Sequence, residues 1–324
     1  MTQEFIYELE DALTPSCHAS TIASSGNVLV AAWFGGTYEK HEDVGIWVSR
    51  KVDDNWSIPV EVVNGVQDDG SRFPCWNPVL FQGDNTLLTL FYKVGPNPRE
   101  WWGMVVTSED NGISWSVPKR LPDGIYGPIK NKPIQLSNDD IISGTSTEHD
   151  GWKIQIERST DGGKAWISSG DLNDGVEFSA IQPTLLVHPN ETIQLLNRTK
   201  NKVISQIWSY DNGKTWGNMS ATMLPNPSAG IDGLTLKDGR HLLVYNPTGT
   251  YERARVPLSV AVSTDGKEWK EIIQLEKVSD PEAKKKPEYS YPAIIQTNDE
   301  LVHIVYTWKR KLIKHVVLNP NMIK

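Results

Sequence analysis

Cationic and aromatic side chains occur at equivalent points along this chain, where short alternating segments predict that β-strands begin or end. An arginine presents a planar fork that matches a carboxylate, while Trp and Tyr rings stack on apolar ring faces. Together these residue types predict a site for an anionic ligand with sugar-like faces. The residues of this kind at the starts of the first predicted strands, with the polar residues beside them, are His18, Arg72, Trp76, Asn77, Lys130, Asn131, Lys132, Gln182, Asp232, Tyr289 and Tyr291.

A second group of charged and aromatic residues lies at the ends of the second predicted strands. A loop after the first unit adds acidic and histidine side chains, which can exchange protons. The net charge of the chain is −8, so this gathering of cations runs against the overall composition. For any single cation a solvated loop is an equally good interpretation, but the convergence of six units favours a site. The second group is Trp33, Lys93, Glu148, Arg198, Arg253, Arg255, Trp308 and Lys309, and the loop carries Glu39, His41, Glu42 and Asp43.

The elements that must position these residues are indicated by a recurring turn sequence, Ser-x-Asp-x-Gly-x-x-Trp. It occurs at 108–115, 159–166 and 209–216, with a version one residue shorter at 263–269, so the starts are 51, 50 and 54 residues apart. This spacing is the size of one small antiparallel sheet and predicts a ring of repeated sheets. Asp and Ser bond nearby backbone amides, Gly permits a positive φ and Trp covers apolar surface, so we expect the turn residues to be structural.

Six units of three predicted strands and a turn account for the chain, which predicts an all-β fold: a single six-bladed β-propeller over residues 1–324. The sixth unit is one strand short, so the N-terminal segment 4–10 is expected to complete it and to remove an exposed edge. Because the first strands of a propeller line its axis, the candidate residues are expected to meet at one mouth. The blade cores are expected at 17–63, 75–121, 130–170, 180–222, 230–275 and 289–318.

Composition argues against several classes of function. The negative net charge disfavours a nucleic-acid partner. Cys17 and Cys75 do not make a disulfide framework, and no Cys or His spacing predicts a zinc site, so no cofactor or metal is expected, with Ca²⁺ on loop carboxylates left open. No apolar run is long enough for membrane insertion. The N-terminus lacks signal-peptide features, which predicts a cytoplasmic protein, or a periplasmic or secreted one if a signal was trimmed.

The Asp-box turns on six predicted sheets resemble the sialidase (neuraminidase) superfamily, and within it the divergent "predicted neuraminidase" group with BNR repeats, over essentially the whole chain. In that family three arginines hold the carboxylate of the substrate. The resemblance places Arg198, in LLNRTK, as the second of them and Arg253, in YNPTGTYER, as the third, with Arg255 as its near neighbour. The position of the first is occupied by His18.

The family uses a Tyr nucleophile at the start of the first strand of the sixth unit, and EYSYPAII offers Tyr289 and Tyr291. In the family this tyrosine lies in a Tyr-Ser-x-Leu segment. The resemblance favours Tyr291, because the aliphatic Ile294 follows it by three residues, whereas Tyr289 matches the segment in the Ser that follows it. A Tyr suits this chemistry because a carboxylate nucleophile would be repelled by a carboxylate on the reacting carbon. Gln182 stands where the family has the glutamate that activates the tyrosine.

The resemblance also implies an acid/base aspartate in the loop after the first unit. Asp43 is the expected residue, with His41 and Glu42 as alternatives. Because the glutamine cannot act as a base, Glu148 or Asp232 is expected to activate the tyrosine.

These inferences predict a sialidase-like, exo-acting glycoside hydrolase that removes a terminal carboxylated sugar, a sialic acid or a related acidic residue, from an acidic oligosaccharide or glycoconjugate. Tyr291 would attack the anomeric carbon and Asp43 would protonate the leaving oxygen. The alternatives are a propeller-type polysaccharide lyase acting on uronic-acid glycans, in which His18 or a Tyr moves protons, and a non-catalytic glycan-binding propeller. The residues expected to contact the substrate are Arg198, Arg253, Arg72, Lys130, Lys132, Gln182, Asp232 and Trp76.

Overall fold

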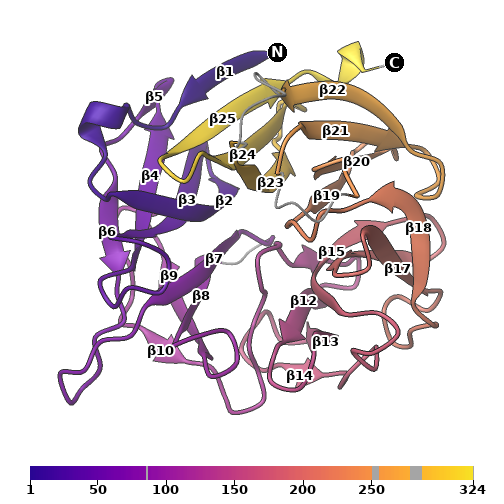
Figure 1. Cartoon of the computed structure of the whole chain (residues 1–324), viewed down its shortest axis with the longest axis horizontal. Helices are drawn as coiled ribbons and strands as arrows, with labels where there is room; N and C mark the ends of the chain where they lie inside the picture. The colour runs from indigo at the N-terminus through magenta and orange to yellow at the C-terminus, as the bar shows by residue number, and fades with distance from the viewer. Residues whose placement is uncertain (85–86, 250–254, 278–286, 324) are drawn as a thin grey trace.

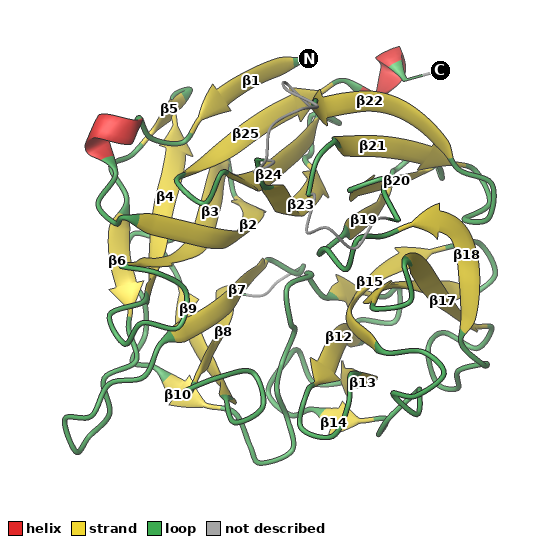
Figure 2. Cartoon of the chain, viewed as in Figure 1, coloured by secondary structure: helices red, strands yellow, loops and turns green. Residues whose placement is uncertain are grey.

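Strands arranged around one axis form the framework of the computed structural model, which describes residues 1–84, 87–249, 255–277 and 287–323. Six antiparallel sheets radiate from the axis (Figure 1). The helices in the described residues are two single turns, η1 (Leu9–Asp11) and η2 (Pro320–Met322) (Figure 2). The predicted all-β, six-bladed propeller is therefore confirmed. Within the described residues, no helix is long and apolar enough to cross a membrane.

Each blade runs outward from an innermost strand next to the axis. The first blade contains β2 (Ser16–Ser25), β3 (Val28–Gly36), β4 (Gly45–Val52), β5 (Asn55–Trp56) and β6 (Val60–Val63). The second contains β7 (Cys75–Phe81), β8 (Leu88–Val94), β9 (Trp102–Ser108) and β10 (Lys119–Arg120). The third contains β11 (Ile134–Gln135), β12 (Ile141–Thr147), β13 (Lys153–Ser159) and β14 (Ile167–Ser168).

The remaining three blades repeat the pattern. The fourth contains β15 (Ala180–Val187), β16 (Ile193–Thr199), β17 (Val203–Ser209) and β18 (Ser220–Pro225). The fifth contains β19 (Asp232–Thr235), β20 (His241–Tyr245), β21 (Leu258–Ser263) and β22 (Lys270–Glu276). The sixth contains β23 (Tyr289–Gln296), β24 (Val302–Trp308), β25 (Leu312–Leu318) and β1 (Thr2–Phe5).

The N-terminal strand closes the ring, as the incomplete sixth unit predicts. β1 pairs antiparallel with β25, with Thr2 opposite Val317 and Phe5 opposite Lys314. Only residues 2–5 of the N-terminal segment form this strand, and residues 9–11 form η1. The first and last strands of the chain therefore share one sheet, and both termini lie at the same side of the ring (Figure 1).

The repeated turns follow the third strands and are built from the same hydrogen bonds in each copy. Asp211 Oδ1 accepts from the backbone N–H groups of Lys214 and Thr215 at 3.0 and 2.8 Å, and Ser209 Oγ donates to it at 2.8 Å. These carboxylates hold the turns closed, so they are structural. The equivalent residues in the other copies are Asp110, Asp161 and Asp265.

The innermost strands share a backbone irregularity close to their starts. Their pairing shifts register in the first, second, fourth and sixth blades. One residue in each shift has a positive φ: Ala19 (56°), Asn77 (36°), Gln182 (57°) and Tyr291 (54°), and Lys130 (73°) precedes β11 in the third blade. Positive φ is uncommon for residues other than Gly, and a bulge redirects a side chain. The fold therefore re-aims selected side chains at this end of the axis.

Candidate functional site

Tyr291 joins two blades through its hydroxyl group. Its side chain comes from the bulge in β23 and is 8% exposed. The hydroxyl oxygen accepts hydrogen bonds from Arg198 Nη1 at 2.7 Å and from Gln182 Nε2 at 3.2 Å. Among the described residues, no carboxylate forms a hydrogen bond with this hydroxyl. Tyr289, the other candidate, is buried in an apolar cluster formed by the fifth and sixth blades, with its ring centre 6.3 Å from that of Trp308.

Arg198, at the end of β16, is a buried cation with an unused donor. Its side chain is 9% exposed, and its guanidinium carbon lies 5.0 Å from the ring centre of Trp152 and 5.8 Å from that of Tyr291. Nη1 also donates to Gln182 Oε1 at 3.2 Å, whereas Nε is buried and has no hydrogen-bond partner in the part of the chain that the structure describes. An unpaired buried donor beside a positive charge is suited to an anion.

Arg255 is the second guanidinium group at the tyrosine. Its central carbon lies 5.4 Å from the ring centre of Tyr291, and Nη1 forms an ion pair with Glu288 Oε1 at 2.7 Å. Arg253, which the sequence predicted as the third carboxylate-binding arginine, lies outside the described residues. Its near neighbour Arg255 is therefore the arginine of this segment that the structure brings to the site.

Arg310, which the sequence analysis missed, is a third guanidinium group nearby. It lies in the turn between β24 and β25, where Nε bonds Glu288 Oε2 at 2.9 Å and Nη1 bonds Glu39 Oε2 at 2.6 Å. Burial by itself raises the pKa of Glu288, but the positive charges of Arg255 and Arg310 outweigh it and hold that pKa well below its usual range. Glu288 is therefore an internal anion shared by two arginines.

His18, on β2, packs against the tyrosine from the first blade. Its ring centre lies 4.2 Å from that of Tyr291, and the side chain is 2% exposed. Burial, with Arg310 beside it, holds the pKa of His18 well below its ordinary value. Arg310 Nη2 lies 3.4 Å from Nε2, and because Arg only donates, Nε2 accepts while Nδ1–H donates to Thr307 Oγ1 at 3.1 Å. His18 is thus a neutral, fully engaged imidazole.

The loop after β3 carries the candidate acid, Asp43. Thr37 donates to Asp43 from its backbone N–H to Oδ1 at 3.0 Å and from its hydroxyl to Oδ2 at 2.5 Å. Burial alone raises the pKa of Asp43, but these bonds and one from His41 outweigh it and lower the pKa. Arg72 Nη2 donates to the Asp43 carbonyl at 2.9 Å, so Arg72 anchors the loop from the connection before β7.

Lys130, from the third blade, crosses the axis and joins two other blades. Its ammonium donates to the carbonyl oxygens of Ile231, at 2.7 Å, and Pro292, and to Asn131 Oδ1 at 2.9 Å. Burial lowers the pKa of this fully enclosed amine to about 7. These contacts engage Lys130 with the protein itself.

Asp232 and Lys132 form a second connection across the axis. Lys132 Nζ lies 3.0 Å from Asp232 Oδ2, which also accepts from the backbone N–H of Ile294 at 3.0 Å. Thr184 Oγ1 donates to Asp232 Oδ1 at 2.8 Å. One carboxylate thus links the third, fourth, fifth and sixth blades, and it forms no hydrogen bond with Tyr291.

Glu148 and Trp76 are likewise engaged with neighbours. Glu148 Oε2 accepts from Trp152 Nε1 at 2.9 Å, and that tryptophan lies under the guanidinium group of Arg198. Trp76 is 2% exposed, donates to the Gly95 carbonyl at 2.8 Å and packs between the rings of Phe34 and Trp101. Neither the carboxylate of Glu148 nor the indole of Trp76 forms a hydrogen bond with Tyr291.

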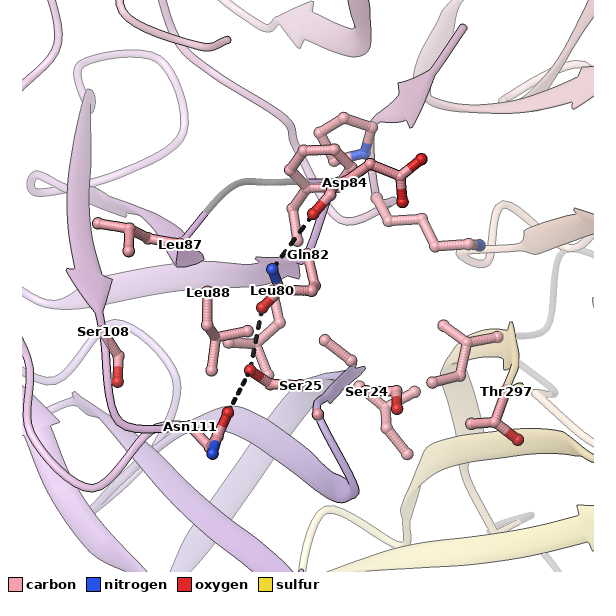
Figure 3. Close-up of a pocket in the computed structure, with 18 of the residues that line it drawn as sticks. Ser24, Ser25, Leu80, Gln82, Asp84, Leu87, Leu88, Ser108, Asn111 and Thr297 are labelled. Atoms are coloured by element: carbon pink, nitrogen blue, oxygen red, sulfur yellow. Dashed lines mark hydrogen bonds between the residues drawn. The ribbon is translucent and has the colours of Figure 1, made fainter. Parts of the chain in front are cut away.

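A large pocket lies at the opposite end of the axis, next to the turns that follow the innermost strands. Its volume is about 610 Å³, and Ser25, Gln82, Asn111 and Thr297 are among its lining residues (Figure 3). The Ser25 hydroxyl lies within hydrogen-bond distance of Gln82 Oε1 at 3.0 Å and Asn111 Oδ1 at 2.9 Å. The charged residues among its described lining are Asp84, Glu109 and Lys132, and no arginine is among them, so the pocket lacks the guanidinium groups of the Tyr291 site.

Within the described residues, no group of three or more His, Cys, Asp or Glu side chains could hold a metal ion. The groups gathered around Tyr291 are its own phenol, three guanidinium groups and the loop after β3, which reaches Arg310 through Glu39.

Comparisons with known proteins place the chain among BNR repeat proteins. The sequence model described as a BNR repeat-like domain matches residues 27–304, and no curated protein matches. A protein of unknown function from Dyadobacter fermentans is similar in structure, with a TM-score of 0.77, 17% identity and coverage of 99% of this chain and 98% of that one.

Two sialidase structures are also similar. The Hadza microbial sialidase Hz136 has a TM-score of 0.80 and 15% identity, and the match covers 100% of this chain and 69% of that one. A mutant of NanB sialidase from Streptococcus pneumoniae has a TM-score of 0.76 and 13% identity, with 96% and 69% covered. At such identities the likeness shows the fold alone.

Proposed function

The chain belongs to the BNR repeat-like domain family, and from this premise we propose that it is an exo-acting glycoside hydrolase for a terminal carboxylated sugar. The observation that carries the proposal is the convergence of Arg198 and Arg255 on Tyr291, with guanidinium carbons 5.8 and 5.4 Å from the centre of its ring. Two guanidinium groups beside one phenol suit a substrate that carries an anion next to the reacting carbon.

Arg198 is the group that we assign to the carboxylate of the substrate. It forms no ion pair with any described carboxylate, and its Nε is an unpaired buried donor. Arg255 and Arg310, in contrast, share the internal anion Glu288. A carboxylate that reaches Arg198 gains charge-assisted hydrogen bonds without displacing a protein anion. Arg255 adds its positive charge 5.4 Å from the centre of the Tyr291 ring.

Tyr291 is the proposed nucleophile. Attack by its phenol oxygen on the anomeric carbon would form a glycosyl-tyrosine intermediate, and an ionised carboxylate in the same role would be repelled by the acidic sugar. Arg198 and Gln182 both donate to the phenol oxygen, so they fix its position and stabilise negative charge that develops on it. The loop that carries Asp43 supplies the proton for the leaving oxygen.

The lyase alternative is less well supported, because it needs His18 or a tyrosine to take a proton from the sugar. His18 is buried, and its two ring nitrogens face Thr307 and Arg310. The non-catalytic alternative is favoured by one observation: Gln182, which is not a base, stands next to the tyrosine. The experiment below separates the three functions.

The test is a panel of fluorogenic glycosides in which acidic sugars are matched with neutral ones, together with uronic-acid glycans read by near-ultraviolet absorbance. We expect hydrolysis of at least one acidic glycoside and none of its neutral counterpart, and loss of about 100-fold or more in kcat/KM when Arg198→Met removes the charge. Arg120→Met is the matched control, because Arg120 is exposed on β10 and lies against Trp102.

A new double bond in the product identifies a lyase, and binding of acidic glycans without turnover identifies a binding propeller. Hydrolysis that is the same for acidic and neutral sugars, or that survives Arg198→Met unchanged, contradicts the proposed function.

A further inference from the structure

Asp43, the expected acid of the loop 37–43, has both carboxylate oxygens occupied. Oδ1 accepts from the Thr37 backbone N–H at 3.0 Å and lies 2.8 Å from His41 Nδ1, and Oδ2 accepts from the Thr37 hydroxyl at 2.5 Å. A proton on this carboxylate would cost part of that network, because each bond requires an acceptor oxygen. The geometry is that of an ionised, orienting group.

His41 is held by this carboxylate and keeps one nitrogen available. Nδ1 lies 2.8 Å from Asp43 Oδ1 and 3.2 Å from the backbone nitrogen of Asp43, and we assign the proton to Nδ1 because the shorter contact, with a carboxylate oxygen, requires one. The ring packs edge-on against Tyr38 with centres 5.1 Å apart. Nε2 has no hydrogen-bond partner among the described residues, and the side chain is 33% exposed. A carboxylate that orients one ring nitrogen leaves the other to exchange a proton with a ligand.

The loop is fastened beside the tyrosine from two blades. Glu39, two residues before His41, bonds Arg310 Nη1 at 2.6 Å, and the same guanidinium group lies 3.4 Å from His18, whose ring packs on Tyr291. On the other side Arg72 Nη2 donates to the Asp43 carbonyl at 2.9 Å. His41 is therefore carried on a loop that is tethered to the Tyr291 site through Glu39, Arg310 and His18.

We propose that His41, and not Asp43, is the catalytic acid and base of this site, and that Asp43 is a positioning residue that orients the imidazole. This inference rests on the proposed hydrolase function and names the proton donor for it. The sequence alone predicted Asp43 as the acid, with His41 as an alternative, and the inference gives each of the two residues its own role.

The step balances as follows. Tyr291 gives its phenol proton to water; its oxygen then forms a bond to the anomeric carbon while the glycosidic C–O bond breaks. The Nε2 proton of the imidazolium moves to the departing oxygen, which leaves as an alcohol. In the second half, neutral Nε2 takes a proton from a water molecule whose oxygen bonds the anomeric carbon, and the bond to Tyr291 breaks, with the phenolate oxygen taking a proton back from water.

Charged groups from the loop and from other elements surround His41. Asp43 contacts it directly, and Glu39 and Glu42 are its acidic neighbours in the loop, with Lys40 as the basic one. From other elements, Arg72 acts on the Asp43 carbonyl and Arg310 is neutralised by Glu39 and Glu288.

The experiment compares two leaving groups on the same acidic sugar. A fluorogenic phenol departs without a proton, whereas a sugar alcohol needs one, so a lost general acid affects only the second strongly. For His41→Gln we expect kcat/KM to fall about 100-fold or more with the sugar aglycone and less than about 10-fold with the phenol. Asp43→Asn should show a smaller fall of the same kind. Lys40→Asn is the control, because Lys40 is exposed and Asn tolerates its positive φ.

The outcomes are distinct. If wild-type protein cleaves both substrates and His41→Gln lowers them equally or not at all, His41 is not the acid. A leaving-group effect seen only in Asp43→Asn assigns the acid to Asp43 and overturns the inference. If the wild-type protein cleaves neither substrate, the proposed function itself fails. Equal melting temperatures of the variants confirm that the comparison concerns folded protein.

Discussion

Arg198, Gln182 and Tyr291 form a closed set of hydrogen bonds whose directions are fixed by the arginine. Because Arg198 only donates, Gln182 must turn its Oε1 toward Nη1, which leaves its amide nitrogen to donate to the tyrosine. Both groups therefore donate to the phenol oxygen. A glutamate at position 182 would instead compete with the substrate for Arg198. The glutamine keeps the positive charge available to an anionic ligand.

The two tyrosines at the start of β23 give the first prediction. Tyr291→Phe removes the oxygen that Arg198 and Gln182 bind, so we expect kcat to fall about 1,000-fold or more. Tyr289→Phe is the matched change, and because Tyr289 is buried in the apolar cluster between the fifth and sixth blades we expect its kcat to stay within about 3-fold of the wild-type value. Steady-state kinetics on an acidic fluorogenic glycoside measures both. A larger fall in kcat for Tyr289→Phe than for Tyr291→Phe would identify Tyr289 as the nucleophile.

Sequence patterns predicted part of this residue arrangement. Arg198 and Tyr291 were named from their motifs, and the structure places them in contact. Glu288 and Arg310 were not named, although they lie directly before β23 and two residues after β24. Arg310 reaches the site because the turn that carries it has a positive φ of 55° and directs a long side chain back over the mouth. Spacing alone does not reveal such a path.

At the scale of elements, the β-bulges near the starts of the innermost strands decide which residue faces the axis. Asn77, Gln182 and Tyr291, all with positive φ, each precede a proline. Proline cannot donate to the ladder and is therefore confined to edges and bulges within sheets. A Pro in the middle of an innermost strand is thus a readable signal of the bulge, and it distinguishes Tyr291 from Tyr289.

The same elements explain why other predicted ligand contacts are instead connections between blades. Lys130, Lys132 and Asp232 lie near the starts of innermost strands, as predicted, but their side chains run across the axis to other blades. Which side chains face the mouth and which face the interior depends on neighbours from distant parts of the chain. A pattern along one strand carries no information about them.

The repeated turns give an element-scale prediction. Asp211→Ala removes the acceptor of the Lys214 and Thr215 amides and of two hydroxyl groups, so we expect the free energy of unfolding to fall by about 1–3 kcal/mol. Activity should be retained, because the turn lies at the far end of the axis from Tyr291. Urea unfolding measures the change, with Asp123→Ala, at a residue that is 98% exposed, as the control. An equal effect of the two substitutions would contradict the structural role of the turn.

At the scale of the whole molecule, the N-terminal strand brings together charged groups from three parts of the chain. Glu4 Oε1 accepts from Trp56 Nε1 at 3.1 Å, lies 2.7 Å from His315 Nδ1 and pairs with Lys51. His315 Nε2 in turn lies 3.0 Å from His303 Nδ1. The sequence predicted that this segment closes the ring because the sixth unit was one strand short. No sequence pattern predicted the contact between His303 and His315.

These buried histidines predict that the fold loses stability in mild acid. Burial lowers the pKa of His303 to about 4. The ordinary pKa of a histidine is about 6.5. Between about pH 6.5 and about pH 4 the unfolded chain therefore binds a proton that the folded chain does not, so the free energy of unfolding falls as the pH decreases through this range. His303→Asn keeps a donor toward His315 and should reduce the loss between about pH 7 and about pH 5 by about 2 kcal/mol.

Urea unfolding at several pH values measures this slope. His149→Gln, at an exposed position, is the control and should leave the slope unchanged. An identical slope in wild type and His303→Asn would contradict the role of His303.

A crystal structure with an acidic monosaccharide bound would show whether the guanidinium groups gathered at Tyr291 hold a carboxylated sugar. We expect the sugar carboxylate within hydrogen-bond distance of Arg198, Arg255 beside it and the anomeric carbon facing the Tyr291 hydroxyl. A sugar that binds at the opposite end of the axis, or that turns its carboxylate away from Arg198, would contradict it.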